Sequence, residues 1–120
     1  MIRGDVCRAA LDPTQGSEQA GTRPVVVVSR DAINKFSPVL IVVPFTDRQN
    51  KTRIYPHHVE IKAGEGGLTT DSIALCEQVR AVAASRLMGP IGHLSNQRIS
   101  QINAALKIAL DLPGGHAFCA

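Results

Sequence analysis

The chain has 120 residues, of which 44% are hydrophobic and 19% charged, and its formal net charge is +3 at pH 7. This composition predicts one compact, soluble domain with its own hydrophobic core, and it argues against a second domain and against a disordered chain. The longest apolar runs, 24–28 and 39–45, fall well short of the roughly 20 residues that cross a bilayer, and no secretion signal is indicated, so we expect a cytoplasmic protein without a membrane span.

The first half of the chain is expected to alternate short strands with loops. Residues 4–11 predict a first strand, and the stretch DPTQGSEQAG that follows predicts a loop because it is built from turn residues. Val25 to Val28 form a continuous β-branched run, which predicts a strand buried on both faces. A single helical turn is expected over 31–36 and a third strand over 39–46. Pro44, near the end of that strand, indicates a sheet edge or a bulge.

The second half predicts further strands and one terminal helix. The expected strands cover 57–62, one long strand at 71–83 and a short one at 91–94. Ser95 is a good N-cap for a helix whose apolar residues recur at helical spacing and which should end before Pro113. Strands followed by one helix, without alternating βαβ units, predict an α+β fold with a mainly antiparallel sheet or small barrel. We expect one domain over 1–112 and a flexible tail over 113–120.

The cysteines and histidines argue against a disulfide framework and a metal site. Cys7, Cys76 and Cys119 are odd in number and include no C-x-x-C pair. We expect small buried hydrophobes, or for Cys119 a thiol in the tail. The four histidines are scattered, with no cysteine or carboxylate at metal-ligand spacing. The sequence therefore predicts neither a metal nor another cofactor.

A basic segment, TDRQNKTR, carries Arg48, Lys51 and Arg53 against Asp47 alone. Such a local excess of positive charge could meet a polyanion. The commoner fate of a run of this kind is an exposed, solvated loop between two strands. Charge alone favours that second interpretation.

Several segments resemble the MazF/PemK toxin family, in the family's order and with plausible gaps. They are RGDVCRAALDPTQGSEQAGTRPVVVVSRDAIN, VPFT, HVEI, GLTTDSIALCEQVR, SRL and IGHLS, and they span the chain from Arg3 to about Leu112. The resemblance implies a compact barrel-like fold related to the SH3 and CcdB proteins. It also implies a sequence-specific, metal-independent endoribonuclease, the toxin of a type II toxin–antitoxin pair, which cuts single-stranded mRNA and so inhibits translation and growth.

RNA chemistry suggests what two candidate residues do. The 2′-hydroxyl can attack the adjacent phosphorus and leave 2′,3′-cyclic phosphate and 5′-hydroxyl ends, if an enzyme positions the strand, moves protons and stabilises the phosphorane. Arg23 can give two parallel hydrogen bonds to phosphate oxygens. The resemblance pairs this arginine with Thr46, whose hydroxyl can hold a phosphate oxygen.

The identity of the proton carrier stays open. A guanidinium holds its proton tightly and is a poor general base, yet the resemblance makes Arg23 the leading acid–base candidate. Glu18, in the loop before it, is a second candidate because a carboxylate can accept the 2′-hydroxyl proton. Structural roles are the alternatives: an ion pair for Arg23, a strand-end position for Thr46 and a loop-ordering hydrogen bond for Glu18. His58 matches a family histidine and is expected to be structural and hydrogen-bonded.

Base recognition is expected to depend on loop hydrogen bonds and charges. Single-stranded RNA is commonly held by aromatic stacking, but the chain has no tryptophan, one tyrosine and three phenylalanines, which excludes a broad stacking platform. The candidate RNA-binding residues are Ser17, Gln19, Arg48, Lys51, Arg53, Glu77 and Gln78. For Glu77 and Gln78 the resemblance implies a place near the RNA groove.

The resemblance further implies a homodimer, and a cognate antitoxin whose acidic, disordered tail lies across the RNA grooves. Two other functions share the expected fold. A CcdB-like toxin would bind a topoisomerase without RNA chemistry, although the C-terminal tryptophan of that protein is missing here, where the chain ends GGHAFCA. A catalytically silent SH3-like binding module would make Arg23 and Thr46 incidental.

Overall fold

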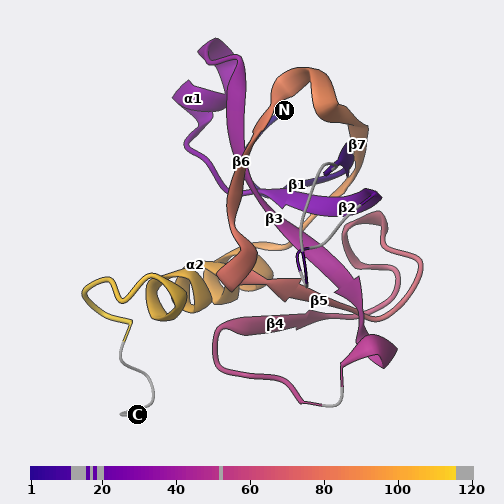
Figure 1. Cartoon of the computed structure of the whole chain (residues 1–120), viewed down its shortest axis with the longest axis vertical. Coiled ribbons are helices and arrows are strands. Elements are labelled where there is room, and N and C mark those ends of the chain that lie inside the picture. Colours follow the sequence, from indigo (N-terminus) through magenta and orange to yellow (C-terminus); the bar gives the residue numbers. More distant parts are fainter. Residues whose placement is uncertain (12–15, 17, 19–20, 52, 116–120) are drawn as a thin grey trace.

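A computed structural model describes residues 1–11, 16, 18, 21–51 and 53–115. Within these residues the chain forms seven strands, two α-helices and four single 3-10 turns (Figure 1). The strands are β1 (Asp5–Ala10), β2 (Thr22–Val27), β3 (Val39–Asp47), β4 (His58–Ile61), β5 (Ser72–Leu75), β6 (Arg80–Ala83) and β7 (Leu87–His93). The helices are α1 (Asp31–Phe36) and α2 (Asn96–Ala109), and the 3-10 turns are η1 (Arg48–Asn50), η2 (Glu65–Gly67), η3 (Cys76–Gln78) and η4 (Ala84–Arg86).

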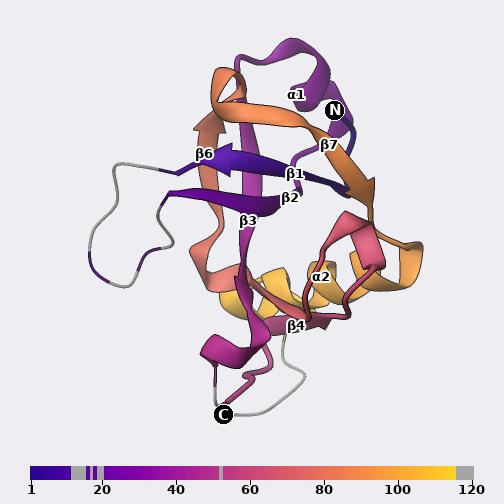
Figure 2. The ribbon, with the colours of Figure 1, turned by 90° about the vertical axis from the view of Figure 1, so that its right-hand side faces the viewer.

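The strands form one antiparallel sheet in the order β4-β5-β3-β2-β1-β7, and β6 pairs with the first half of β3. The predicted α+β class and antiparallel sheet are confirmed. The sheet is not closed, because the strands at its two ends, β4 and β7, do not pair with each other. The barrel-like shape comes from curvature: β1 and β2 cross the middle of β3, and β4 and β5 lie beside its second half (Figure 2).

The segment after β4 covers the open side of this curved sheet. Its turn η2 packs against β7, and the two backbones meet where only glycines fit. A Cβ at Gly67 would lie 2.1 Å from the carbonyl oxygen of Ile91, and a Cβ at Gly92 would lie 2.3 Å from the carbonyl carbon of Gly66. Because glycine has no side chain, the backbones of η2 and β7 can lie in direct contact at these two positions.

Two hydrophobic cores lie on opposite faces of the central strands. Val26 packs with Phe45, Ile61 and Ile102 in the core between the sheet and α2. Its neighbours Val25 and Val27 belong to the second core, which the curved sheet encloses with Leu40 and Val82. Because successive residues of a strand point to opposite faces, the valine run is buried on both faces, as the sequence predicts.

Pro44 lies in a central strand and not at an edge. On one side β3 pairs with β2, where Val25 is opposite Pro44. On its other side β3 pairs with β6 up to Val42 and with β5 from Phe45 onward. Pro44, which has no backbone N–H to donate, thus lies where the strand paired with β3 changes from β6 to β5. Of the two expectations for Pro44, the sheet edge is wrong, and the bulge lies in the strand opposite, between β5 and β6.

The long strand predicted over 71–83 is wrong, because the chain breaks it into β5, η3 and β6. Both strands pair with β3, but in different registers: Phe45 is opposite Ala74, and Val42 is opposite Arg80. The offset between these registers equals the three residues of η3. The alternation of apolar residues continues through this bulge, so periodicity could not reveal it.

The C-terminal elements follow the sequence more closely. Ser95 caps α2, its Oγ accepting the Arg98 backbone N–H at 3.2 Å. Buried Ile102 and Ala105 face the core, and α2 packs against β4 and η3. β7 is longer than the short strand expected at 91–94. No helix within the described residues has the length and apolar character to cross a membrane.

Candidate functional site

One groove brings together Arg23 and Thr46, the two residues that the family resemblance pairs. It has a volume of about 280 Å³ and is lined from β1, β2, the end of β3 and the segment before β5. Arg23 is half-buried at the start of β2, and Thr46 is 5% exposed. The last residues that β2 and β3 pair with each other, Val25 and Pro44, are each two positions away from them. The sheet register therefore places a cationic fork and a hydroxyl at one site, a combination suited to a phosphate group.

Arg8 is a further residue of this groove, which the sequence reasoning missed. It lies on β1 opposite Pro24, and it is exposed among the lining residues. A second guanidinium at the groove adds to the attraction for a polyanion. The two strands were predicted, but their register depends on the loop between them, so no signal in the sequence indicated that Arg8 would lie near Arg23.

A second groove, of about 200 Å³, brings together Glu18, Glu77 and Gln78. Glu77 and Gln78 project here because η3 lifts them out of the sheet. Arg80 also lines this groove and donates from Nη1 to the carbonyl oxygen of Leu11 at 3.1 Å, which ties β6 to the end of β1. Pro44 lines the second groove while Phe45 and Thr46 line the first, so the two grooves adjoin along β3.

The structure thus separates the three predicted catalytic residues into two adjoining grooves. Glu18 lines the groove of Glu77 and Gln78, and it is not among the described residues that line the groove of Arg23 and Thr46. The predicted RNA-binding residues Ser17 and Gln19 lie outside the described residues.

Glu77 is held by two histidines that precede and begin β4. His58 Nε2 lies 3.3 Å from the Glu77 carboxylate, and His57 Nε2 lies 3.9 Å from it. The Tyr55 backbone N–H donates to His58 Nδ1 at 3.2 Å. That bond leaves the proton of the neutral ring on Nε2, from which it is donated to Glu77. Burial lowers the pKa of His58, against the opposing effect of the Glu77 hydrogen bond. The predicted structural, hydrogen-bonded role of His58 is confirmed.

His57, His58 and Glu77 also form a group whose possible ligand atoms lie within 4.8 Å of one another. The sequence did not reveal this, because Glu77 is distant from the histidines along the chain. The hydrogen bonds argue against a metal here: the neutral His58 ring carries its proton on Nε2, the atom that faces the group, and its Nδ1 is occupied by Tyr55. An ion would have to displace that proton and reverse the tautomer.

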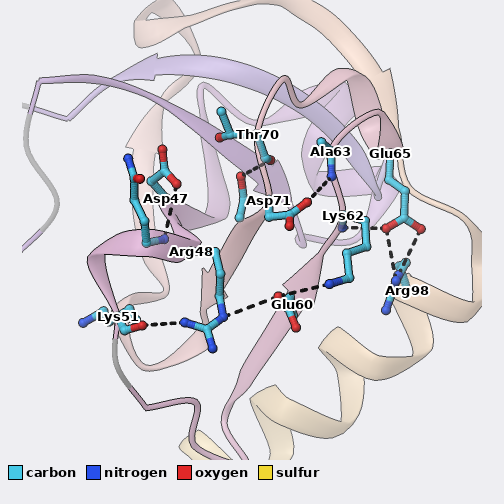
Figure 3. A network of polar contacts seen from close by, with 12 residues as sticks. Asp47, Arg48, Lys51, Glu60, Lys62, Ala63, Glu65, Thr70, Asp71 and Arg98 are labelled. Carbon is cyan, nitrogen blue, oxygen red and sulfur yellow. Dashed lines mark hydrogen bonds and ion pairs between the residues drawn. The ribbon is translucent and has the colours of Figure 1, made fainter.

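The basic segment divides into a tied part and an outer part. Arg48 forms an ion pair with Glu60, with Nε 3.4 Å from Oε2, and donates to the carbonyl oxygen of Lys51 (Figure 3). Arg53 lies outside this network, exposed, with its guanidinium 5.8 Å from the centre of the Tyr55 ring. Arg48 therefore orders the loop, in keeping with the solvated-loop interpretation, while Arg53 belongs to an exposed aromatic cluster.

Cys7 and Cys76 are buried and have no disulfide. Burial raises the pKa of the Cys7 thiol to about 11 and that of Cys76 to about 12. Neither is a thiolate near neutral pH, so neither is a nucleophile. The prediction that they are small buried hydrophobes is confirmed.

Comparisons with known proteins agree with this architecture. The family model for the PemK-like, MazF-like toxin of type II toxin–antitoxin systems matches residues 2–110. The Endoribonuclease MazF of Staphylococcus saprophyticus is 46% identical over 112 residues, which make up 93% of this chain and 92% of that protein. A mycobacterial endoribonuclease solved in complex with its cognate antitoxin has a TM-score of 0.76 at 25% identity, covering 94% of this chain and 97% of that one. MazF from Deinococcus radiodurans shares the fold, with a TM-score of 0.78 at 22% identity over 93% and 97% of the two chains.

Proposed function

Because this chain belongs to the PemK-like, MazF-like toxin family of type II toxin–antitoxin systems, we propose that its Arg23–Thr46 groove holds the scissile phosphodiester of a single-stranded RNA. The protein is an endoribonuclease and the toxin of such a pair, neutralised by a cognate antitoxin. The observation that carries the proposed site is the meeting of Arg23 and Thr46 in one groove.

The proposed reaction is an internal transesterification of RNA that needs no metal ion. The 2′-oxygen forms a bond to phosphorus while the bond from phosphorus to the 5′-oxygen breaks, so the products carry a 2′,3′-cyclic phosphate and a 5′-hydroxyl. One proton leaves the 2′-hydroxyl for a base, and one reaches the departing 5′-oxygen from an acid. The pentacoordinate intermediate carries extra negative charge on its non-bridging oxygens, which is where donors help most.

Arg23 is suited to stabilise that charge. Its guanidinium is cationic at neutral pH and can donate two parallel hydrogen bonds to the phosphorane. Its place on β2, next to Pro24, fixes the direction from which it enters the groove. We assign it the acid–base role as well, with the 5′-oxygen as the group that it protonates. Thr46, on the rigid end of β3, would donate its hydroxyl to a non-bridging oxygen.

Glu18 remains the proposed acceptor of the 2′-hydroxyl proton. Its groove adjoins that of Arg23 along β3, so a strand bound across both could present its ribose to Glu18 and its phosphate to Arg23. Glu77 and Gln78 line the same groove as Glu18 and can accept and donate hydrogen bonds at base edges. We propose that they contribute to a sequence-specific cut.

The assembly and the setting are further parts of the proposal. We infer a cytoplasmic homodimer, which light scattering would test, and an antitoxin whose acidic, disordered tail occupies the grooves lined by Arg8, Arg23 and Arg80. The topoisomerase-binding and silent-module alternatives are not favoured, because the relative that is 46% identical over 93% of the chain is an endoribonuclease.

The decisive experiment incubates the purified protein with a long single-stranded RNA in excess EDTA and maps the fragment ends. We expect discrete cuts by the wild type with cyclic phosphate and 5′-hydroxyl ends, and none by a folded Arg23→Ala variant. Arg30→Ala, an exposed arginine that lines neither groove, is the matched control and should cut normally. Cutting that requires added metal, or that survives Arg23→Ala, would overturn the mechanism.

A further inference from the structure

The segment before β4 carries a stack of three planar side chains, Arg53, Tyr55 and His57. The Tyr55 and His57 rings are nearly parallel, with 10° between their planes and 5.5 Å between their centroids. The Arg53 guanidinium lies over the Tyr55 ring, 5.8 Å from its centre. A count of tyrosine, phenylalanine and tryptophan missed this stack, because an imidazole and a guanidinium supply two of its three planes.

The buried His58 ring packs against both Tyr55 and His57. Its ring meets Tyr55 at 77° and His57 at 67°, with centroid distances of 5.6 Å and 4.5 Å. The Tyr55 backbone N–H donates to His58 Nδ1 at 3.2 Å, and the His58 backbone N–H donates to the Tyr55 carbonyl at 2.9 Å. Since His58 is buried and starts β4, it fixes the Tyr55 and His57 rings to the sheet. A ligand would meet a surface whose ordering cost is already met by folding.

The surroundings of the stack suit a nucleic acid strand. Tyr55 is 45% exposed, so part of its ring is open to solvent. Lys51 and Arg53, which both precede Tyr55 in the chain, supply positive charge. Glu77, which the two histidines hold, lines the groove that also contains Glu18 and Gln78. An aromatic face beside cations, next to a polar groove, is the arrangement that binds single strands.

We propose that the Tyr55 ring, supported by His57 and His58, is a stacking subsite for one nucleobase of the RNA substrate, adjacent to the Glu77–Gln78 groove. This inference rests on the proposed function. Arg53 moves aside or onto the outer face of the base, as an exposed, unbranched side chain can. Every base has a π-face, so the subsite supplies affinity and fixes the register of the strand, and it does not read the sequence. Recognition is left to the groove beside it.

The chain offers an internal reporter for this subsite. Tyr55 is its only tyrosine and it has no tryptophan, so the intrinsic fluorescence of the unlabelled protein comes from this ring. The probe is a short RNA that spans a mapped cut and carries a 2′-deoxy nucleotide in place of the attacking ribose. We expect it to quench the tyrosine emission as it binds. A series of the same probe with one abasic position at a time should identify a single nucleotide whose base is required for quenching.

Variants of Tyr55 test how much stacking on its ring contributes to the affinity for the probe. Tyr55→Ala should bind the probe about tenfold to a hundredfold more weakly, which is the range for losing one stacked base, and Tyr55→Phe should bind as the wild type does. The abasic probe should bind the wild type and Tyr55→Ala equally. Phe36→Ala is the matched control, because Phe36 is an aromatic residue on α1 that is 79% exposed and lines neither groove.

The outcomes separate this inference from the proposed function. Normal RNA cleavage by the wild type, with a tyrosine emission that the probe does not quench and with an unchanged affinity of Tyr55→Ala for the probe, would overturn the subsite and leave the endoribonuclease intact. A wild type that neither cuts nor binds any RNA would overturn both. Quenching by an antitoxin peptide but not by the RNA probe would overturn the subsite as well, because it would make the stack a protein contact.

Discussion

Arg23 and Thr46 lie on neighbouring strands, each two residues beyond the last pair of the ladder, Val25 and Pro44, and both line one groove. Beyond that pair β2 and β3 separate, so that Arg23 is paired with Ala9 of β1 and Thr46 with Ile73 of β5. The first two predictions test whether this relationship is the catalytic one.

Arg23→Lys should lose most of the activity although it keeps the positive charge. A lysine cannot give two parallel hydrogen bonds from a planar fork, and removing one such donor from a developing oxyanion costs roughly a hundredfold to a thousandfold in kcat. Single-turnover cleavage measures the rate, and circular dichroism checks the fold. A purely structural ion pair would instead leave most of the rate in place with lysine.

Thr46→Val should reduce kcat by roughly tenfold to a thousandfold, because it removes the hydroxyl and keeps the shape of the side chain. Thr46→Ser retains the hydroxyl and should lose much less. Thr46 is 5% exposed, so the melting temperature is measured for both variants. A valine variant that cleaves normally would assign Thr46 a merely structural position at the end of β3.

Glu18→Gln should remove the acidic limb of the pH–rate profile if Glu18 accepts the 2′-hydroxyl proton, because an amide cannot act as a base. The matched variant is Glu77→Gln, which lies in the same groove and should raise KM while the shape of the profile stays unchanged. An intact acidic limb in Glu18→Gln would transfer the role of base to another group.

The folded protein should lose stability as the pH falls from neutral toward 5, in part through His58. Burial lowers the pKa of this histidine in the folded state below its usual 6.5. As the pH falls, the unfolded chain therefore binds a proton at His58 before the folded protein does. The contribution of the neutral His58 to the free energy of unfolding is complete above about pH 6.5 and declines below it until the pH reaches the lowered pKa of the folded state. Urea unfolding at several pH values should show a shallower decline for His58→Gln. An equal decline in the free energy of unfolding of the wild type and of His58→Gln would exclude His58 as a source of the pH dependence.

The Glu65–Arg98 pair, which joins η2 to α2, should make a small contribution of about 0.5 kcal/mol, since both side chains are partly exposed. Arg98 donates from Nε and Nη2 to the two carboxylate oxygens, each at 3.1 Å (Figure 3). This hydrogen bonding lowers the pKa of Glu65, so the contribution is present above about 4.5 and disappears as the pH falls through the lowered value. Glu65→Gln unfolding with and without added salt measures it. If added salt does not reduce the loss of unfolding free energy that Glu65→Gln causes, the result would contradict a surface ion pair.

The sequence predicted those elements whose signals are local. The α1 turn occupies the residues expected from them, and the Ser95 cap and the valine run need no distant partner to be recognised. The bulge at η3 could not be predicted, because it depends on two strands pairing with different halves of β3. The same dependence on distant partners explains the site. Arg23 and Thr46 were paired through a family resemblance. The sheet register alone brings Arg8 to the Arg23 groove, and it alone brings Glu77 to His57 and His58.

The close approach of η2 to β7 also bears on how the protein behaves in a crowded cell. β7 is a terminal strand of the sheet, and it exposes Met88 and Ile91. A bare edge with apolar side chains would be a template for pairing with strands of other molecules. A side chain at Gly67 or Gly92 would push the η2 turn off this edge. Glycine at these two positions therefore keeps the η2 turn against this part of the β7 edge.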